Sequence, residues 1–156
     1  MEDLYLKIAA RLHALIPELD HIDEDTGQLY PVQYDDRFEY PILFPCLLID
    51  ASTVDWKDEK IVGSQRGSAT VTLKLAFRMD EDTHFEPPSF NDFEQLRMRR
   101  AIERRIAGAL HCYCLGDGMS PLYRTISRSY SQPGRVRVTE MTFRVNVTEK
   151  LFAFEE

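Results

Sequence analysis

The chain has 156 residues, of which 44% are hydrophobic, and a formal net charge of −7 at pH 7. This length supports one domain with a substantial core, and no apolar run approaches the ~20 residues of a bilayer span, which excludes a membrane-spanning helix. The cysteine count is odd and the start MEDLYLK is acidic where a secretory signal is basic, so we expect a reducing compartment and no export signal.

The first predicted element is a helix over residues 3–16. Its apolar residues recur at helical spacing on one face, namely Leu4, Ile8, Leu12 and Leu15. Pro17 disfavours helical geometry in the residue before it, so the helix should end there. The acidic stretch 17–27 has no helical period and is predicted to be a loop. A divalent-metal loop is an alternative, although the spacing differs from that of an EF-hand; its oxygen ligands would be Asp20, Asp23 and Asp25.

The following segments are predicted to be an irregular excursion over residues 28–40 and a strand over residues 43–51. The strand sequence LFPCLLIDA is almost continuously apolar, which favours burial on both faces. Pro45 should mark its first residues, because proline cannot donate to a strand ladder. Residues 53–62 could extend this strand or pair with it. A second strand is predicted over residues 68–79, where apolar and polar residues alternate.

Residues 80–92 contain Pro87, Pro88 and several acids, which indicates an irregular connector. They lead into a long helix predicted over residues 91–113, with Asn91 as its N-cap. Apolar residues at spacings of three and four form a stripe along it: Met98, Ile102, Ile106, Ala109, Leu110 and Tyr113. The opposite side carries three arginines, here called the arginine ridge: Arg97, Arg100 and Arg104.

Two further strands are predicted over residues 122–130 and 135–148, joined by a turn at 132–134. In the first strand the apolar residues in phase are Leu122, Ile126 and Tyr130. In the second strand the apolar parity changes between residues 138 and 141. One extra residue would reconcile the two halves, so a β-bulge is predicted near Thr139 or Glu140.

These elements predict an α+β fold as a single domain over residues 1–156, with an antiparallel or mixed β-sheet packed against two main helices, 3–16 and 91–113. Both helices need a flat apolar surface to cover. The sheet face that could supply it consists of Val71, Leu73, Leu75, Phe143 and Val145. The apolar residues 151–154 are expected to dock on the same core.

Few residues show the pattern of a catalytic or metal site. The cluster HCYC at 111–114 lacks the second Cys/His pair that a four-ligand zinc site needs, which predicts an inert helix end. Asp50 followed by DEK at 58–60 loosely resembles the carboxylates and lysine of magnesium-dependent nucleases. The same residues also suit an exposed hairpin tip. We therefore predict no enzymatic activity and no cofactor; the alternative is a nuclease that uses Asp50, Asp58 and Lys60.

A second alternative is a nucleic-acid-binding domain centred on the arginine ridge. Further arginines that could add to such a surface are Arg124, Arg128, Arg135 and Arg137. A sequence pI near 5.1 argues against this alternative, because most of the surface would repel a polyanion. Nucleic acid is therefore not the expected partner.

The order of elements is helix, acidic excursion, buried strand, alternating strand, long helix and terminal hairpin. Together with GQLY at 27–30 and FPCLLID at 44–50, it resembles the tail-terminator and tail-completion (head–tail joining) proteins of tailed phages and prophages. The resemblance implies a structural subunit that forms a homo-oligomeric ring, with a hexamer as one candidate size, and joins tail to head. Implied partners are its own copies, tail-tube proteins and head–tail connector proteins. The implied locations are the bacterial cytoplasm during assembly and then the tail or neck of the virion.

The charge distribution predicts how copies could meet. Residues 1–60 carry 14 Asp and Glu against 5 Lys and Arg, whereas residues 91–156 carry 11 Lys and Arg against 8 Asp and Glu. The acidic loops 18–25 and 80–86 of one copy could contact the arginine ridge of the next, and such a heterologous contact can close into a ring. The alternative is that both charge groups are solvated surface. The candidate interface residues are Arg97, Arg100, Arg104, Asp80, Asp82, Phe85, Phe90, Phe38 and Tyr40.

Overall fold

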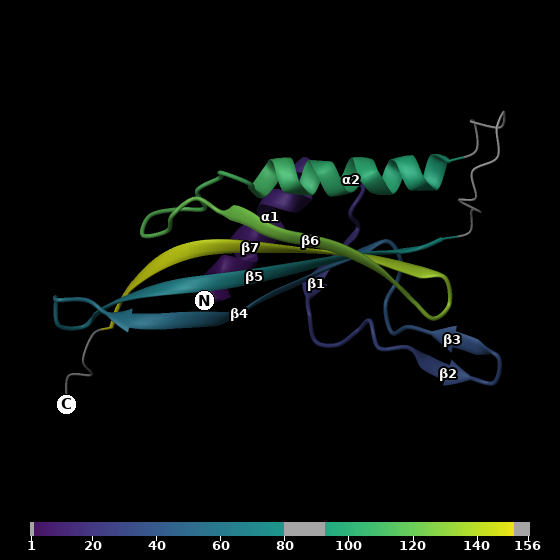
Figure 1. Cartoon of the computed structure of the whole chain (residues 1–156), viewed down its shortest axis with the longest axis horizontal. Coiled ribbons are helices and arrows are strands. Elements are labelled where there is room, and N and C mark those ends of the chain that lie inside the picture. The colour runs from purple at the N-terminus through teal and green to yellow at the C-terminus, as the bar shows by residue number, and fades with distance from the viewer. Residues whose placement is uncertain (1, 80–92, 152–156) are drawn as a thin grey trace.

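Five strands form one mixed sheet in the order β1-β4-β5-β7-β6 (Figure 1). The structure, a computed structural model, describes residues 2–79 and 93–151. Within the sheet β1 pairs with β4 in parallel, and the other pairs are antiparallel. The strands are β1 His21–Glu24, β4 Cys46–Asp58, β5 Ser64–Arg78, β6 Tyr123–Gln132 and β7 Val136–Lys150.

Two helices, α1 (Glu2–Leu15) and α2 (Glu94–Leu110), pack on one face of this sheet. In Figure 1, α2 runs along the top of the molecule and α1 passes behind the strands. Their buried side chains join those of β4, β5 and β7 in one apolar cluster, which includes Leu4, Ile8, Leu12, Ile102, Ile106, Leu110, Leu47, Leu73 and Phe143. The predicted α+β fold, with a mixed sheet and two main helices, is confirmed. Of the described residues, neither helix is long and apolar enough to cross a membrane.

The opposite face of the sheet is covered in part by the segment that precedes β4. This segment contains a small antiparallel hairpin, β2 (Val32–Tyr34) and β3 (Arg37–Glu39), so the irregular excursion predicted over residues 28–40 is wrong at its centre. A second apolar cluster lies beneath it, with Leu29, Cys46, Leu48, Ala76, Val136 and Val138 buried. The first residues of β4 are therefore buried on both faces, as predicted from their continuous apolar sequence.

The acidic stretch 17–27 is not the loop that its composition predicted, because it contains β1 at the sheet edge. Its polar groups have partners within the fold. Asp25 Oδ2 accepts a hydrogen bond of 2.7 Å from Lys74 Nζ, and Gln28 Nε2 donates to the Glu24 carbonyl at 2.8 Å and to Asp23 Oδ2 at 3.3 Å. Among the described residues no group of His, Cys, Asp and Glu could hold a metal ion. Asp20, Asp23 and Asp25 are therefore not brought together as a group of metal ligands in this structure.

The predicted bulge near Thr139 or Glu140 is also wrong. The register between β5 and β7 runs unbroken from Ser64↔Lys150 to Arg78↔Val136. The apolar residues of β7 change parity because different elements pack on opposite faces of the sheet at the two ends of this strand. Val136 and Val138 pack in the cluster beneath the β2–β3 segment, whereas Met141, Phe143, Val145 and Val147 face the helices. Register shifts occur instead in β4 between Asp50 and Thr53 and in β6 between Arg124 and Ile126.

Several predicted core residues are exposed. Leu15, at the end of α1, is exposed, and the next residue, Ile16, is buried in its place. Ile126 is exposed because the register shift in β6 takes it out of phase with Leu122. The docking predicted for residues 151–154 fails at Leu151, which is exposed, and the other three lie outside the described residues.

The long helix is shorter than predicted at both ends. Met98, at the start of the predicted stripe, is exposed, and Tyr113 lies beyond the end of α2. The N-cap residue of α2 is Phe93, which makes no side-chain capping hydrogen bond, and the predicted N-cap Asn91 lies outside the described residues. The middle of the stripe, from Ile102 to Leu110, is buried as predicted.

Candidate interface surfaces and an arginine-lined pocket

The arginine ridge lies on the side of α2 that faces away from the sheet. Arg97, Arg100 and Arg104 are all exposed, as the helical spacing predicted. Arg100 Nη1 forms an ion pair of 3.1 Å with Glu103 Oε2. An exposed pair of this kind contributes little to stability.

The other predicted interface residues divide into two groups. Phe38 lies in β3 and Tyr40 directly follows it, next to the β6–β7 turn. Tyr40 is partly engaged inside the fold, because its hydroxyl donates a 2.5 Å hydrogen bond to the Pro133 carbonyl and its ring meets Phe44 edge-on at 5.3 Å. Burial raises the pKa of Tyr40. The second group lies outside the described residues: Asp80, Asp82, Phe85 and Phe90.

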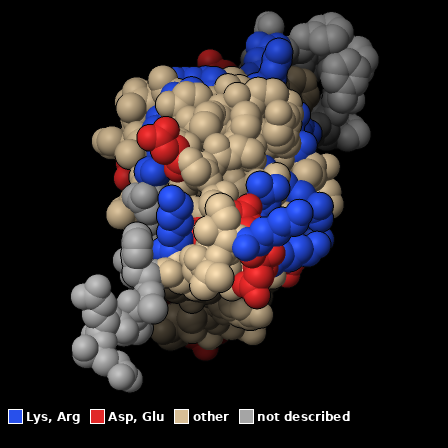
Figure 2. Space-filling model, turned by 90° about the vertical axis from the view of Figure 1, so that its left-hand side faces the viewer, with Lys and Arg blue, Asp and Glu red and all other residues tan. Residues whose placement is uncertain are grey.

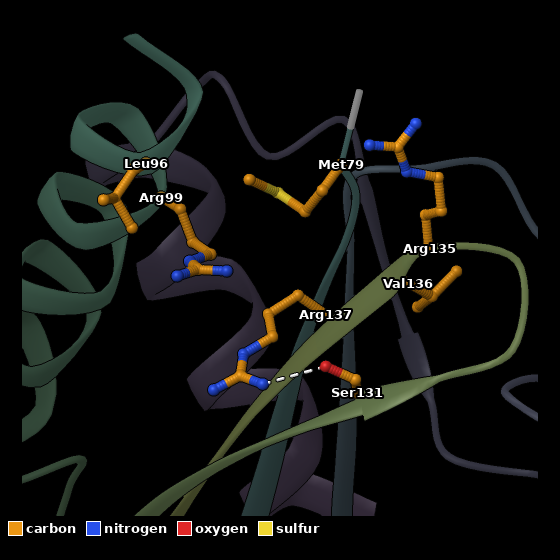
Figure 3. Close-up of a pocket in the computed structure, with 7 residues that line it drawn as sticks. All are labelled: Met79, Leu96, Arg99, Ser131, Arg135, Val136 and Arg137. Carbon is orange, nitrogen blue, oxygen red and sulfur yellow. Dashed lines mark hydrogen bonds between the residues drawn. The ribbon is translucent and has the colours of Figure 1, made fainter. Parts of the chain in front are cut away.

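A pocket with a volume of about 560 Å³ lies between the start of α2 and the β6–β7 hairpin (Figure 3). Leu96 and Arg99 come from α2, Met79 follows β5, and the other lining residues are Ser131, Arg135, Val136 and Arg137. Figure 3 shows the guanidinium groups of Arg99 and Arg137 extending from α2 and β7 toward the same space, while Arg135 extends away from them. Arg137 Nη1 donates a 2.9 Å hydrogen bond to Ser131 Oγ.

Arg99 is the most unusual residue of this pocket, because it is a buried cation with 7% of its surface exposed. It forms an ion pair with Glu103, whose Oε1 lies 3.8 Å from Arg99 Nε, too far for a hydrogen bond. That oxygen accepts a 2.5 Å hydrogen bond from Thr139 Oγ1 instead. Within the described part of the chain, the buried Arg99 Nε has no hydrogen-bond acceptor.

Electrostatics agree with this geometry. Burial lowers the pKa of Arg99 below its ordinary value; Glu103 counteracts the shift, and the positive charges of Arg100 and Arg137 add to it. The sequence analysis missed this residue. Its signal was its position, because Arg99 lies three residues before Ile102 and seven before Ile106 and so falls on the buried stripe of the helix.

The residues of the nuclease alternative do not meet. Asp50 and Asp58 lie eight positions apart on the same strand, β4, which separates them by roughly 25 Å at the rise of an extended chain. Asp50 Oδ1 accepts hydrogen bonds from the backbone N–H and the hydroxyl of Ser52, which lower its pKa. Asp58 lies at the exposed β4–β5 tip, where its Oδ1 accepts from Gln65. A magnesium site that joins both carboxylates is therefore not formed.

The seven arginines of the nucleic-acid alternative do not form one continuous surface. Arg128 forms an ion pair of 3.1 Å with Glu140. Glu140 is in register with Lys74 and Leu48, on the face opposite the helices. Arg137 instead lies beside Arg99 on the helix side. The sheet itself separates the two groups.

Residues 111–114 connect the end of α2 to β6. His111 Nδ1 accepts a 3.1 Å hydrogen bond from the Arg124 N–H, and the His111 ring meets Tyr123 edge-on at 5.7 Å. Cys112 has a positive φ of 61°, and its N–H donates to the Leu122 carbonyl at 2.7 Å. These contacts hold the segment in place as the connection between α2 and β6. Cys112 and Cys114 are exposed free thiols.

The β4–β5 tip is a further surface, and it is the exposed hairpin tip that residues 58–60 suited in the sequence analysis. Its turn exposes two large apolar side chains, Ile61 and Val62, and Leu151 lies exposed beside it, with its N–H bonded to the Gly63 carbonyl. Figure 2, which views the molecule from this end, shows positive and negative side chains gathered side by side, next to a broad uncharged surface. The charged residues around the tip include Lys57, Asp58, Glu59, Lys60 and Arg66.

Comparison with solved structures finds a chain of similar fold in a particle described as "Virion of native gene transfer agent (GTA) particle". The two chains superimpose with a TM-score of 0.56 and 12% sequence identity, over 94% of this chain and 95% of the other. At this identity the likeness shows a shared fold. No protein-family model matches this sequence, and no curated protein matches it.

Proposed function

We propose that this protein is a structural subunit of a phage-type virion, and specifically a tail terminator that forms a homo-oligomeric ring at the head–tail junction. The observation that carries the proposal is the fold shared with a chain of a virion particle over nearly the whole length of both chains. Because fold alone does not determine function, the surfaces of this chain must supply the rest of the argument.

Two groups of exposed apolar side chains lie at opposite ends of the molecule. At one end are Ile61 and Val62 of the β4–β5 tip, with Leu151 beside them. Near the other end, where the β2–β3 hairpin, the β6–β7 turn and the start of α2 lie (Figure 1), are Tyr30, Val32, Tyr34, Leu43 and Met98. Different apolar surfaces at two ends suit a heterologous contact between successive copies, which closes into a ring when the rotation permits.

Charge adds a second component. The arginine ridge is exposed on α2, and the acidic segment 18–25 follows α1 and contains β1. Glu18 already forms an ion pair of 2.6 Å with Arg105, which shows that acids of this segment can pair with arginines of α2. Exposed ion pairs are individually weak, so apolar contacts must supply most of the affinity. The charged residues would then determine how one copy is oriented against the next.

The proposed partners are other copies of the chain, the tail tube and the head–tail connector, and the proposed locations are the bacterial cytoplasm during assembly and then the virion neck. The function requires surfaces and no catalytic step. An epitope-tagged copy, expressed in the cell that encodes the particle, tests this directly. Purified particles are labelled with antibody-coated gold and viewed by electron microscopy.

Gold at the head–tail junction is the expected result. Particles that lack the protein altogether would contradict a virion role. Gold distributed along the whole tail, or at its far end, would leave a virion protein but refute the terminator assignment. An untagged strain provides the control for nonspecific gold.

A further inference from the structure

The pocket between α2 and the β6–β7 hairpin contains more positive charge than the described residues neutralise. Arg99, Arg135 and Arg137 line it, and the nearby Glu103 is shared between Arg99, Arg100 and the Thr139 hydroxyl. Arg99 Nε is buried and lacks an acceptor within the described part of the chain. A buried donor without a partner costs free energy, which an acceptor entering the pocket would recover.

We propose that this pocket binds a carboxylate side chain of an acidic peptide segment on a partner protein, with the guanidinium groups of Arg99 and Arg137 and the hydroxyl of Ser131 as donors. The inference goes beyond the proposed ring, because it assigns a ligand to a site that neither the ridge nor the exposed apolar ends includes.

The geometry suits a carboxylate. Two guanidinium groups from different elements extend toward the same space (Figure 3), and a guanidinium presents its N–H groups in a fork that matches two carboxylate oxygens. Ser131 Oγ accepts from Arg137, so the O–H of Ser131 can donate to a ligand oxygen. A bound carboxylate would also reduce the repulsion between Arg99 and Arg137.

The chemistry of the lining favours a peptide over a nucleic acid. Met79, Leu96 and Val136 provide apolar walls beside the arginines, which suits the aliphatic stem of Asp or Glu and an apolar neighbour. A nucleic acid would bring a run of charges near a protein with a net charge of −7. A single carboxylate gains the local attraction with far less of that repulsion.

Heteronuclear NMR of the full chain, with arginine Nε–H groups labelled, tests the proposal. The probes are a blocked peptide Gly-Asp-Leu-Glu-Gly, its amide analogue Gly-Asn-Leu-Gln-Gly, inorganic phosphate and a short oligothymidylate at the same ionic strength. The acidic peptide should shift the Nε–H resonances of Arg99 and Arg137 saturably, and the amide analogue should not.

The test variants are Arg137→Gln, which removes one guanidinium group, and Ser131→Ala, which removes the hydroxyl with little change in shape. The matched control is Arg144→Gln, an exposed arginine on the same strand, β7. Arg137→Gln should weaken binding of the acidic peptide by about tenfold, Ser131→Ala by a smaller factor, and the control should leave it unchanged.

Three results would overturn the proposal. They are an absence of saturable shifts with the acidic peptide, equal binding by the Arg137→Gln and Arg144→Gln variants, and tighter binding of phosphate or oligothymidylate than of the acidic peptide. Ring formation is measured separately by sedimentation, so failure of this site would not count against the proposed assembly function.

Discussion

The guanidinium carbon of Arg11 lies 3.3 Å from the centroid of the Tyr113 ring, and Arg11 Nε donates a 2.6 Å hydrogen bond to the Ala109 carbonyl. One residue of α1 therefore contacts both the last turn of α2 and the segment that follows it. α2 has no basic residue in its own last turn, so Arg11 supplies the positive charge that favours a helix C-terminus.

Replacing Arg11 with Gln should destabilise the protein by about 1–2 kcal/mol, because the hydrogen bond to the last turn and the cation–π contact are lost together. Chemical denaturation followed by circular dichroism measures the change. His13→Ala, an exposed position on the same helix, is the control and should have a small effect. Equal stability of the Arg11→Gln variant and the parent would show that the contact contributes nothing.

Replacing Ile106 with Asp should destabilise the protein by at least ~3 kcal/mol. Ile106 is fully buried in the cluster between α2 and the sheet, where an unpaired carboxylate cannot be solvated. Ala101→Asp, on the exposed side of α2, carries the same new charge and should cost about 1 kcal/mol or less. The packing described here is wrong if both variants melt at the same temperature.

The three cysteines should differ sharply in reactivity. Burial raises the pKa of Cys46 to about 12, and its side chain is fully buried, whereas Cys112 and Cys114 are exposed free thiols. Because the thiolate is the reactive species, a thiol reagent at pH 8 should label the two exposed cysteines and spare Cys46. Labelling of Cys46 should appear only after unfolding. Mass spectrometry of native and denatured samples identifies the sites.

The pH dependence of stability should report on Asp50. The hydrogen bonds from Ser52 hold the pKa of Asp50 below its ordinary value, so its contribution is present above that ordinary value and is lost as the pH falls through the lowered one. Asp50→Asn should therefore be less stable than the parent at pH 7, and the difference should shrink in acid. Asp55→Asn, which removes the same charge at an exposed position on the same strand, is the matched control.

Reversing the arginine ridge should lower the association state while leaving the monomer folded. The triple variant Arg97→Glu, Arg100→Glu and Arg104→Glu changes only exposed side chains, which rarely cost much stability. Sedimentation velocity across a range of salt concentrations measures the effect. Association of the parent should weaken as salt increases, because exposed charges are screened.

The control for this prediction carries the same charge change at exposed positions outside the ridge: Arg124→Glu, Arg144→Glu and Lys150→Glu. It should associate more strongly than the ridge variant. Equal association of the parent and the ridge variant would exclude the ridge from the interface. A parent that stays monomeric at high concentration would remove the support for intrinsic ring formation.

The sequence by itself determined the elements that pack with the same face against the core along their whole length. In β5, apolar and polar residues alternate with the period of a strand, and in α2, Ile102, Ile106 and Leu110 recur with the period of a helix. These patterns can be recognised without knowing which element packs against the buried face. The apolar run at the start of β4 likewise predicted burial on both faces, and it lies between two clusters.

Only the tertiary structure decided at which point along a strand the buried face changes from one side of the sheet to the other. In β7, Val138 packs beneath the β2–β3 segment and Met141 beneath the helices, so the parity changes without a bulge. The sequence of β7 cannot distinguish an inserted residue from a cover that moves to the other face. β1 was missed for a related reason, because an acidic edge strand is held by pairing with β4 and has no period of its own.

The candidate site likewise has one part that the sequence predicted and one part that only the tertiary structure revealed. Helical spacing sufficed to place Arg97, Arg100 and Arg104 on the exposed side of α2. The pocket required α2 to meet the β6–β7 hairpin, since Arg99 comes from α2, Ser131 from β6 and Arg137 from β7. Arg99 becomes a candidate binding group because, among the described residues, its buried Nε–H has no hydrogen-bond acceptor, and that condition depends on contacts that local sequence does not encode.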